Sequence, residues 1–389
     1  MSLFARWHHK RLNAWSLAQL FTPFKAALDQ VPALVARGNR PLQMTFDDQL
    51  KILTYYHLEE HSSGRHLLQV LKQEGFAATH IAPPAGIEKS AFFEAINSRG
   101  LEQMVHVYEN LQKQARAKLP IAKEISELGD LIAVDGSFID ATLSMVWADY
   151  RKEVKKAKVH LGFDVGRGIP QKMTLTRGKG DERIQAKHLV APGQTGVYDR
   201  GYQCYNNFDD WQTQNCHFVC RIKASSRKTV LQENVVNPDS HIFYDAVVLL
   251  GTKDINQTKQ KVRVVGYKVD GISYWVATDR FDLTAEQIAL IYKLRWTIES
   301  FFAWWKRHLK VYHVIARSPY GLLMQIIAGL ITYLLLAIYC HDQYGERVSI
   351  GRVRELRCKI RNEAAQNSIY TGLAPPGFAD LDFGAYATS

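Results

Sequence analysis

The chain has 389 residues, of which 47% are hydrophobic, so it can bury a sizeable core and is not a disordered polymer. It carries 49 Lys and Arg residues against 38 Asp and Glu, a net charge of +11, which suits a polyanion such as nucleic acid without establishing one. Five cysteines in a chain of this length exclude a disulfide-stapled scaffold. No apolar stretch of secretory length opens the sequence, so we expect a cytoplasmic protein.

Residues 1–128 predict a helical N-terminal domain. Apolar residues at helical spacing between positions 23 and 36 predict a first helix, although Pro32 favours a break within it. Thr45 is a suitable N-cap for the next helix, because acidic residues follow it in the first turn. Residues 61–75 predict another helix, which ends at its last glycine.

Two further helices are expected at residues 87–99 and 101–111, joined at Gly100 in the manner of a helix-turn-helix. The polar side chains available to phosphates or bases are Ser90, Asn97 and Arg99. The alternative is plain helix packing, since helix pairs are common in proteins. We expect residues 1–128 to form a DNA-binding domain.

From residue 130 onward, the hydrophobic pattern changes from that of helices to that of strands. The stretch LIAVDGSFID has the pattern of a buried strand, with Asp135, followed by Gly136, expected at a strand end, and a later strand ends near Asp199. The expected strands are 131–140, 158–165, 171–178 and 195–202, with a short helix at 181–190. Three strands, a helix and a strand open an RNase H-like fold. We therefore expect residues 129–217 to be the first part of an α/β, RNase H-like mixed-sheet catalytic core.

The remainder of the chain is expected to contain three parts. Residues 218–280 alternate strand patterns with polar loops and predict a mainly β insertion. Residues 281–361 predict the second part of the core with basic helices, because Trp304 to Arg361 holds ten Lys and Arg against three Asp and Glu. Residues 362–389 have turn composition and predict an irregular tail.

One stretch has the length of a membrane span. Leu322 to Cys340 is 19 residues long and contains one strongly polar side chain, Gln325. No second such stretch exists, and basic residues lie on both sides of this one. The same pattern is typical of a helix buried on all faces, and we expect such a helix rather than a membrane protein.

The most informative stretch lies in a helix expected at 284–308. Tyr292, Arg295, Glu299 and Lys306 follow the spacing Y-x2-R-x3-E-x6-K, and residues three, four and seven apart share one face of a helix. One acid, two bases and a phenol then form a polar stripe on an otherwise apolar helix. A solvated face with ion pairs explains such a stripe, and so does a site for a polar ligand.

Further motifs accompany this spacing. Trp296 directly follows the arginine, YDRGY occupies 198–202 and YWVATD occupies 274–279. In these motifs the chain resembles the DDE insertion-sequence transposases with the Y-R-E-K signature, the family named after insertion sequence type four. The resemblance covers about Leu131 to Leu335.

The resemblance implies three catalytic and metal-binding carboxylates, Asp135, Asp199 and Glu299. Two Mg²⁺ ions, for which Mn²⁺ can substitute, neutralise the attacking and leaving oxygens in such phosphodiester chemistry. Asp140 and Asp164 are alternative ligands. A straight strand points Asp140 to the face opposite Asp135, whereas Asp164 can enter the site. The D-G motif of the resembled family favours Asp135.

The resemblance also implies DNA-binding roles for five other residues. Arg295 and Lys306 are expected to bind phosphates, and Tyr292 is expected to donate a hydrogen bond near the cut. Trp275 and Trp296 resemble aromatic positions near the transposon end, where an extruded base can stack while a hairpin forms. Trp275 also fits a strand of the core.

The function implied by the resemblance is that of a DNA transposase, which cleaves at transposon ends and transfers the strand into target DNA, with a hairpin intermediate as one route. Its expected partners are the terminal inverted repeats, target DNA and a second copy of the chain, in the cytoplasm at a prokaryotic nucleoid and without a membrane. The alternatives are an RNase H-like metal-dependent nuclease and a catalytically inactive DNA-binding protein.

Overall fold

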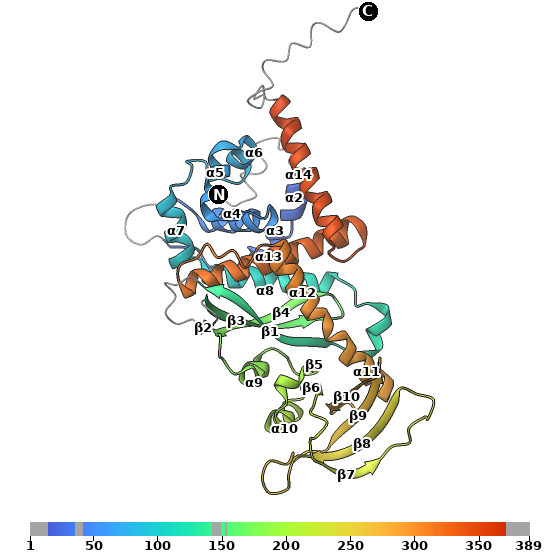
Figure 1. The fold of residues 1–389 in the computed structure, drawn as a ribbon. Helices are drawn as coiled ribbons and strands as arrows, with labels where there is room; N and C mark the ends of the chain where they lie inside the picture. Colours follow the sequence, from blue (N-terminus) through green and yellow to red (C-terminus); the bar gives the residue numbers. More distant parts are fainter. Residues whose placement is uncertain (1–14, 36–41, 142–148, 152–153, 371–389) are drawn as a thin grey trace, which may run out of the picture. The chain divides into compact units, whose positions relative to one another are not determined.

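The computed structural model describes residues 15–35, 42–141, 149–151 and 154–370. The chain forms two compact units (Figure 1). Unit 1 comprises residues 1–115 and 307–389, and unit 2 comprises residues 116–306. Unit 1 is helical in its described part, whereas the strands belong to unit 2.

Some of the helices of unit 1 begin and end near the positions expected from the sequence. They are α2 (Trp15–Phe21), α3 (Phe24–Ala27), α4 (Phe46–Leu58), α5 (Gly64–Gln73), α6 (Gly75–His80), α7 (Lys89–Ser98), α8 (Leu101–Lys118), which runs on into unit 2, α13 (Pro319–Tyr344) and α14 (Ile350–Tyr370). Thr45 caps α4 in a capping box with Asp48, which confirms the expected helix start. The helix expected from 23 to 36 is wrong, because only α3 forms before Gln30 adopts a φ of 61°. Helix α6 was not expected.

Helix α13 is the apolar segment whose length matches a membrane span. It is capped by Ser318, has Pro319 in its first turn and ends at Gly345, which has a left-handed φ of 67°. It is the one helix among the described residues that is long and apolar enough to cross a membrane, and 94% of its most apolar window is buried. The expectation of a buried helix is confirmed.

A neutral polar network lies in the core of unit 1. The buried amide of Gln325 accepts a hydrogen bond from the Ile315 amide at 2.9 Å and donates one to the His313 carbonyl at 2.7 Å. Tyr56 donates to the same carbonyl at 3.0 Å. The ring nitrogens of His57 lie 2.6 Å from the Leu309 carbonyl oxygen and 3.2 Å from that of Gln325. Burial lowers the pKa of His57 to about 4, so the ring is neutral at pH 7.

Unit 2 is built on a ten-stranded mixed sheet with the order β2-β3-β1-β5-β6-β10-β9-β8-β7, and β4 pairs with β3. The strands are β1 (Leu131–Ala141), β2 (Asp149–Arg151), β3 (Val154–Asp164), β4 (Ile169–Arg177), β5 (Thr195–Tyr198), β6 (His217–Arg221), β7 (Lys228–Glu233), β8 (Ile242–Leu250), β9 (Val262–Val269) and β10 (Ile272–Thr278). β1 is antiparallel to β3 and parallel to β5, and β5 is parallel to β6. The mixed α/β class is therefore confirmed.

The strands expected at 218–280 extend this same sheet. β10 pairs antiparallel with β6 from Val276 to Thr278, so β7 to β10 continue the sheet beyond β6 (Figure 1). The sequence patterns did not indicate β7, whose residues are mostly exposed, or the short β2. The other helical elements of unit 2 are η1 (Lys123–Leu128), α9 (Glu182–Gln185), η2 (Ala186–His188), η3 (Arg200–Tyr202), α10 (Tyr205–Thr213), α11 (Ala285–Leu294) and α12 (Trp296–His308).

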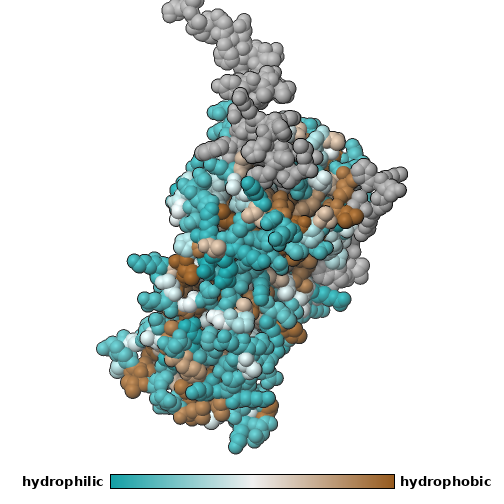
Figure 2. Space-filling view, turned by 180° about the vertical axis from the view of Figure 1, so that it is seen from behind, coloured by the Kyte–Doolittle hydropathy of each residue, from teal (hydrophilic) through white to brown (hydrophobic). Residues whose placement is uncertain are grey.

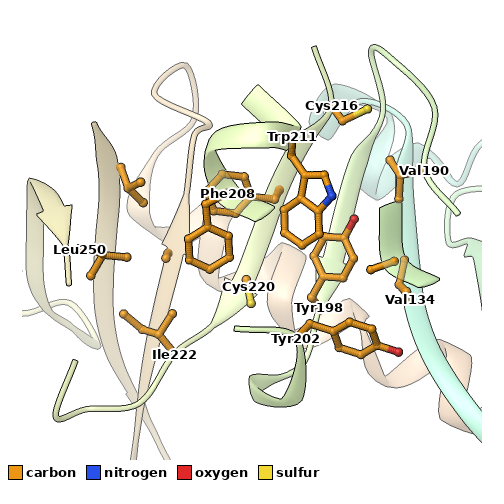
Figure 3. Close-up of a cluster of buried hydrophobic side chains, with 14 of the residues drawn as sticks. Val134, Val190, Tyr198, Tyr202, Phe208, Trp211, Cys216, Cys220, Ile222 and Leu250 are labelled. Atoms are coloured by element: carbon orange, nitrogen blue, oxygen red, sulfur yellow. The ribbon is translucent and has the colours of Figure 1, made fainter. Parts of the chain in front are cut away.

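A buried cluster of aromatic and aliphatic side chains fills one face of this sheet (Figure 3). The rings of Tyr198 and Trp211 stack with centroids 4.3 Å apart, and those of Phe208 and Phe218 stack at 4.5 Å. Val134 of β1 also lies in the cluster. Because side chains alternate along a strand, the neighbours of Val134 point to the opposite face of the sheet.

The surface and the end of the chain complete the fold. Hydrophilic residues predominate on the face drawn in Figure 2, with hydrophobic residues in small groups. All five cysteines are free. Helix α14 continues to Tyr370, so the expectation of an irregular tail is wrong for 362–370, and residues 371–389 lie outside the described part.

Candidate active site

Strand β1 carries Asp135 on the face away from the buried cluster. Asp135 lies inside the strand, opposite Leu161 of β3, and not at its end as the sequence suggested. Its carboxylate accepts a hydrogen bond from the Gly136 amide at 2.7 Å. A Cβ atom added to Gly136 would lie 2.5 Å from Cε of Lys158, so the glycine leaves room for a lysine that packs directly over the strand.

Asp199 follows the last residue of β5. It is the N-cap residue of η3, and its carboxylate accepts a short hydrogen bond from the Gly201 amide. β5 is parallel to β1 and directly beside it, with Tyr198 in register with Val134. The pairing therefore brings the residue after β5 next to the one after Val134, which is Asp135.

Helices α11 and α12 carry the remaining expected residues other than Trp275, and Arg295 separates the two helices. The single helix expected at 284–308 is therefore wrong in detail, because Arg295 ends α11 as its C-cap. In α12, the ring of Phe301 packs against Phe163 of β3 at 4.8 Å, and Phe163 shares a sheet face with Asp135. Glu299 is consequently held on the face that carries Asp135.

Arg295 joins two of the acids. One guanidinium nitrogen, Nη2, donates to Glu299 Oε1 at 2.7 Å, and the other, Nη1, lies 4.0 Å from Asp135 Oδ2. The arginine side chain is only 11% exposed. A buried guanidinium thus lies between two carboxylates that come from a strand and a helix 164 residues apart in sequence.

The charges of the three acids act on one another. Burial raises the pKa of Asp135 above its ordinary value, and the negative charges of Asp199 and Glu299 raise it further. The Gly136 amide and Arg295 oppose this rise. The structure therefore brings Asp135, Asp199 and Glu299 within electrostatic reach of one another, while Arg295 supplies the compensating charge.

The family resemblance implies bound Mg²⁺, and the side chains of the site can be compared with the ligands that this ion requires. Three carboxylates provide the oxygen ligands that Mg²⁺ prefers. Within the described residues, no three His, Cys, Asp or Glu side chains lie close enough to hold an ion as they stand. The guanidinium of Arg295 lies between Asp135 and Glu299 and supplies positive charge there. The three carboxylates would be the ligands of the ion, and the chemistry of their oxygens fits it.

Tyr292 and Lys306 border the acids from the two helices. Tyr292 is 6% exposed, and Arg295 lies over its ring with 5.8 Å between the guanidinium carbon and the ring centroid. Burial raises the pKa of the Tyr292 phenol, which keeps it a hydrogen-bond donor at neutral pH. Lys306 donates to the Phe138 carbonyl of β1 at 2.6 Å, and burial lowers its pKa.

The two expected aromatic residues lie in different surroundings. Trp296 is 65% exposed at the start of α12. Trp275 packs against the buried cluster, with Lys228 Nζ 4.4 Å from its ring centroid. Its neighbour Tyr274 points the other way, with its ring 6.2 Å from that of Tyr292. Trp275 is therefore on the sheet face opposite Tyr292.

The alternative carboxylates lie elsewhere in unit 2. Asp140 is exposed near the end of β1 and pairs with Lys156 at 2.5 Å. Asp164 is buried and pairs with Arg167 at 3.1 Å, close to Arg116 at 3.9 Å. Both carboxylates have partners that explain them as structural ion pairs.

Sequence reasoning assigned no role to Tyr202, Lys158 and Glu182. The hydroxyl of Tyr202 is buried and has no hydrogen-bond partner within the described chain, and its pKa is raised by burial and by the charges of Asp135 and Asp199. Lys158, packed over Gly136, forms an ion pair with Glu182 of α9. The second tyrosine of the YDRGY motif was the available signal for Tyr202, whereas nothing in the local sequence linked Lys158 to Glu182.

A pocket of about 690 Å³ adjoins the site on the side of α11. Arg295, Tyr292 and Trp296 line it together with basic and aromatic side chains of the sheet. The guanidinium of Arg221 lies 4.8 Å from the ring centroid of Tyr274, and that ring stacks on Tyr267 at 5.3 Å. The pocket thus combines cationic groups with flat aromatic faces.

Comparison with known proteins finds a transposase family and relatives that are named as transposases. The model of the transposase DDE domain matches residues 127–335, more than half of the chain. A probable transposase for insertion sequence element IS5377 of Geobacillus stearothermophilus is 27% identical over 209 residues, which are 53% of this chain and 55% of that protein. The putative transposase y4zB of Sinorhizobium fredii is 27% identical over 198 residues, 49% of this chain and 56% of that protein.

A third relative matches over a longer stretch. It is a putative transposase for insertion sequence element IS4SA of Synechocystis, 22% identical over 278 residues, which are 70% of this chain and 77% of that protein. The chain spans just over half the length of the first two relatives. The matched domain contains all three acids and the spacing from Tyr292 to Lys306, and the chain belongs to the family of DDE insertion-sequence transposases.

Proposed function

We propose that this chain is a DNA transposase whose catalytic residues are Asp135, Asp199 and Glu299. The observation that carries the proposal is that Asp135 of β1 and Glu299 of α12 lie on either side of the Arg295 guanidinium, while the charge of Asp199, after β5, acts on Asp135. Burying mutually repelling carboxylates costs stability, and such costs are characteristic of functional sites. Membership of the DDE transposase family supports the same reaction class.

An RNase H-like core is part of this proposal. Its support is the strand order β4-β3-β1-β5-β6, in which β3 is antiparallel to β1 while β5 and β6 are parallel to it. We further propose that residues 1–128 bind DNA and that two chains act together at two DNA ends. Of the polar side chains expected to meet DNA, Asn97 already accepts hydrogen bonds from the amides of Arg317 and Ser318, so we omit it from that role.

The reaction consists of two displacements at phosphorus. Water attacks at the end of the element, and a new P–O bond forms as the bond to the 3′ oxygen breaks, which leaves a 3′-OH. That hydroxyl then loses its proton and attacks a target phosphate, displacing the 3′ oxygen of the target strand. Two Mg²⁺ ions held by the three acids would supply the positive charge that these oxygens require.

The basic residues of the site hold the substrate. Arg295 is suited to a bidentate contact with a phosphate once it leaves Glu299, and Lys306 can offer its remaining N–H groups as a point charge. Tyr292, kept protonated by burial, donates a hydrogen bond to the same phosphate. The exposed ring of Trp296 is available to stack on an unpaired base if a hairpin forms.

The test is cleavage and joining with the purified chain. Duplex DNA that carries the inverted repeat bordering the reading frame is incubated with Mg²⁺, and nicking is followed together with joining of a precut end to plasmid DNA. We expect Asp199→Ala and Glu299→Gln to lower nicking by more than about 100-fold, because each ligand supports several kcal/mol of charge stabilisation. DNA binding should persist.

Asp140→Asn is the control at an alternative carboxylate, since it removes an acid of the same strand that pairs with Lys156. Full activity of Asp199→Ala, or loss of activity in Asp140→Asn alone, would refute the assignment. Degradation without joining by the wild-type chain would favour the alternative of a nuclease. DNA binding without any cleavage would favour an inactive binding protein.

A further inference from the structure

A second pocket, of about 1040 Å³, includes Asp199 in its lining. Its walls are η3, the start of α10, the loop between β6 and β7, and the turn that follows β8. We call it the η3 groove. It lies wholly within unit 2, and Asp199 is the one acid among its lining residues.

The η3 groove is strongly basic. Arg200, Lys223 and Arg227 line it with exposed side chains, and in the described part of the chain none of them forms an ion pair with a carboxylate. A fourth cation, Arg183, pairs with Asp181 at 2.8 Å. Three unpaired cations converging on one hollow repel one another, so an anionic ligand would be attracted to it.

Neutral hydrogen-bonding groups lie between these cations. Ser225 and Ser226 come from the loop that carries Lys223 and Arg227, and Asn256 comes from the opposite wall. Such a mixture of arginine, lysine and small polar side chains is typical of surfaces that follow a phosphodiester backbone. An apolar pocket for a small molecule is the alternative, and it fits less well because most of the lining residues are charged or polar.

The η3 groove and the pocket of Tyr292 and Arg295 share no lining residue, so they are separate hollows that both include a residue of the candidate site. Asp199 lines the η3 groove, and Arg295 lines the pocket beside α11. Tyr274 also lines the pocket beside α11, whereas its neighbour Trp275 points to the opposite sheet face. A nucleic-acid strand with one phosphate at the acids must continue in two directions, and each of the two basic hollows offers a path for one of them.

We propose that the η3 groove binds the phosphodiester backbone on the side of the reacting phosphate away from Tyr292 and Arg295. The proposal rests on the proposed function. The same backbone chemistry has two sources, the DNA that flanks the element before cleavage and the target DNA that is joined to it afterwards. Arg200, Lys223 and Arg227 are the contacting residues.

The test uses the full chain and the double variant Lys223→Ala/Arg227→Ala. Binding is measured by fluorescence anisotropy in EDTA, so that no DNA is cut, with three fluorescein-labelled probes. The first is a duplex of the bordering inverted repeat that stops at the cut, the second extends beyond the cut, and the third is a random-sequence duplex added to the chain already saturated with the first. The double variant Lys172→Ala/Lys261→Ala removes the same charge from exposed positions that line neither pocket.

We expect the groove variant to bind the first probe like the wild type. Weaker binding of the second probe assigns the groove to flanking DNA, and weaker binding of the third assigns it to target DNA. In either case the slope of log affinity against log salt should fall by about 1.8, since two phosphate contacts are lost. The control variant should retain the wild-type slope with every probe.

Two results would overturn the inference. One is wild-type affinity and salt slope of the groove variant for the second and third probes. The other is an equal loss of affinity for all three probes, or an equal loss in the control variant, which would indicate general charge attraction. Because binding is read without metal, a chain that binds as predicted but never cleaves DNA refutes the proposed function and leaves the groove assignment standing.

Discussion

The two units bury polar groups in different ways. In unit 1, Tyr56 and Gln325 donate to the His313 carbonyl, and the neutral ring of His57 lies between two carbonyl oxygens, to one of which it can donate. In unit 2, the ionisable side chains of Asp135, Glu299 and Arg295 lie together, and the nearby hydroxyl of Tyr202 has no partner within the described residues. Hydrogen bonds between neutral groups stabilise a fold, whereas buried ionisable groups and an unpaired hydroxyl are retained at the cost of stability.

The largest effect that we expect from this contrast is acid instability of unit 1. Burial lowers the pKa of His57 from 6.5 to about 4, so the folded chain binds fewer protons than the unfolded chain between these values. Stability is therefore lost as the pH falls from 6.5 to 4, by up to about 3 kcal/mol from this residue. Urea unfolding at pH 7 and at pH 4.5, followed by tryptophan fluorescence, measures the loss.

His57→Gln should be less stable at pH 7, because its carbonyl partners lose a well-placed ring, but its stability should depend less on pH. His188→Gln, which removes an exposed histidine from unit 2, is the control and should keep the wild-type dependence. An unchanged pH dependence in His57→Gln would contradict the assignment of a neutral buried ring.

A smaller effect is expected at Arg295. Arg295→Gln leaves Asp135 and Glu299 without a countercharge, which should lower the free energy of unfolding in EDTA by about 1–3 kcal/mol. The same variant should gain more thermal stability from Mg²⁺ or Mn²⁺ than the wild type, since no guanidinium competes with the ion. Calorimetry with and without metal gives both numbers.

Arg183→Gln removes an arginine from an exposed ion pair with Asp181 and should change stability by less than about 0.5 kcal/mol. If Arg295→Gln responds to metal no more than this control, the guanidinium does not stand in for a cation.

The smallest effect on stability is expected at Trp296. Its ring is 65% exposed, so Trp296→Ala should alter the free energy of unfolding by no more than about 0.5 kcal/mol. If the ring stacks on a base, the affinity for DNA with an unpaired terminal base should fall by about 1–3 kcal/mol, while that for fully paired DNA should hardly change. Equal affinities of the variant and wild type for both probes would exclude stacking.

Much of the fold could be predicted from sequence patterns, and the three acids were predicted from the resemblance to the transposases. Strands such as β8 are mostly apolar, and Thr45 was identified as the N-cap of α4, where it forms a capping box. The exposed strand β7 has no such pattern, because pairing with β8 rather than burial stabilises it. Local patterns also did not reveal the break at Arg295, whose α-region backbone looks helical while its side chain turns to Glu299.

The site required information that no local pattern holds. The spacing from Tyr292 to Lys306 indicated one polar face, but the partner of Arg295 on β1 depends on how the helix packs on the sheet. Tyr202 and the pair of Lys158 with Glu182 arise from contacts between elements far apart in sequence. The surroundings of Trp275 could not be predicted from the local sequence either. The alternation of side chains along β10 shows which residues share a face, but not which face meets α11.

The pairing of β10 with β6 has a consequence for engineering chimeric enzymes. Strands β7 to β10 share main-chain hydrogen bonds with the core and return the chain directly to α11, so they are not a detachable module. Deleting them would leave β6 as a bare sheet edge, open to aggregation. Exchanges between relatives should therefore keep β6 to β10 together, because β8 also pairs with β9 along most of its length.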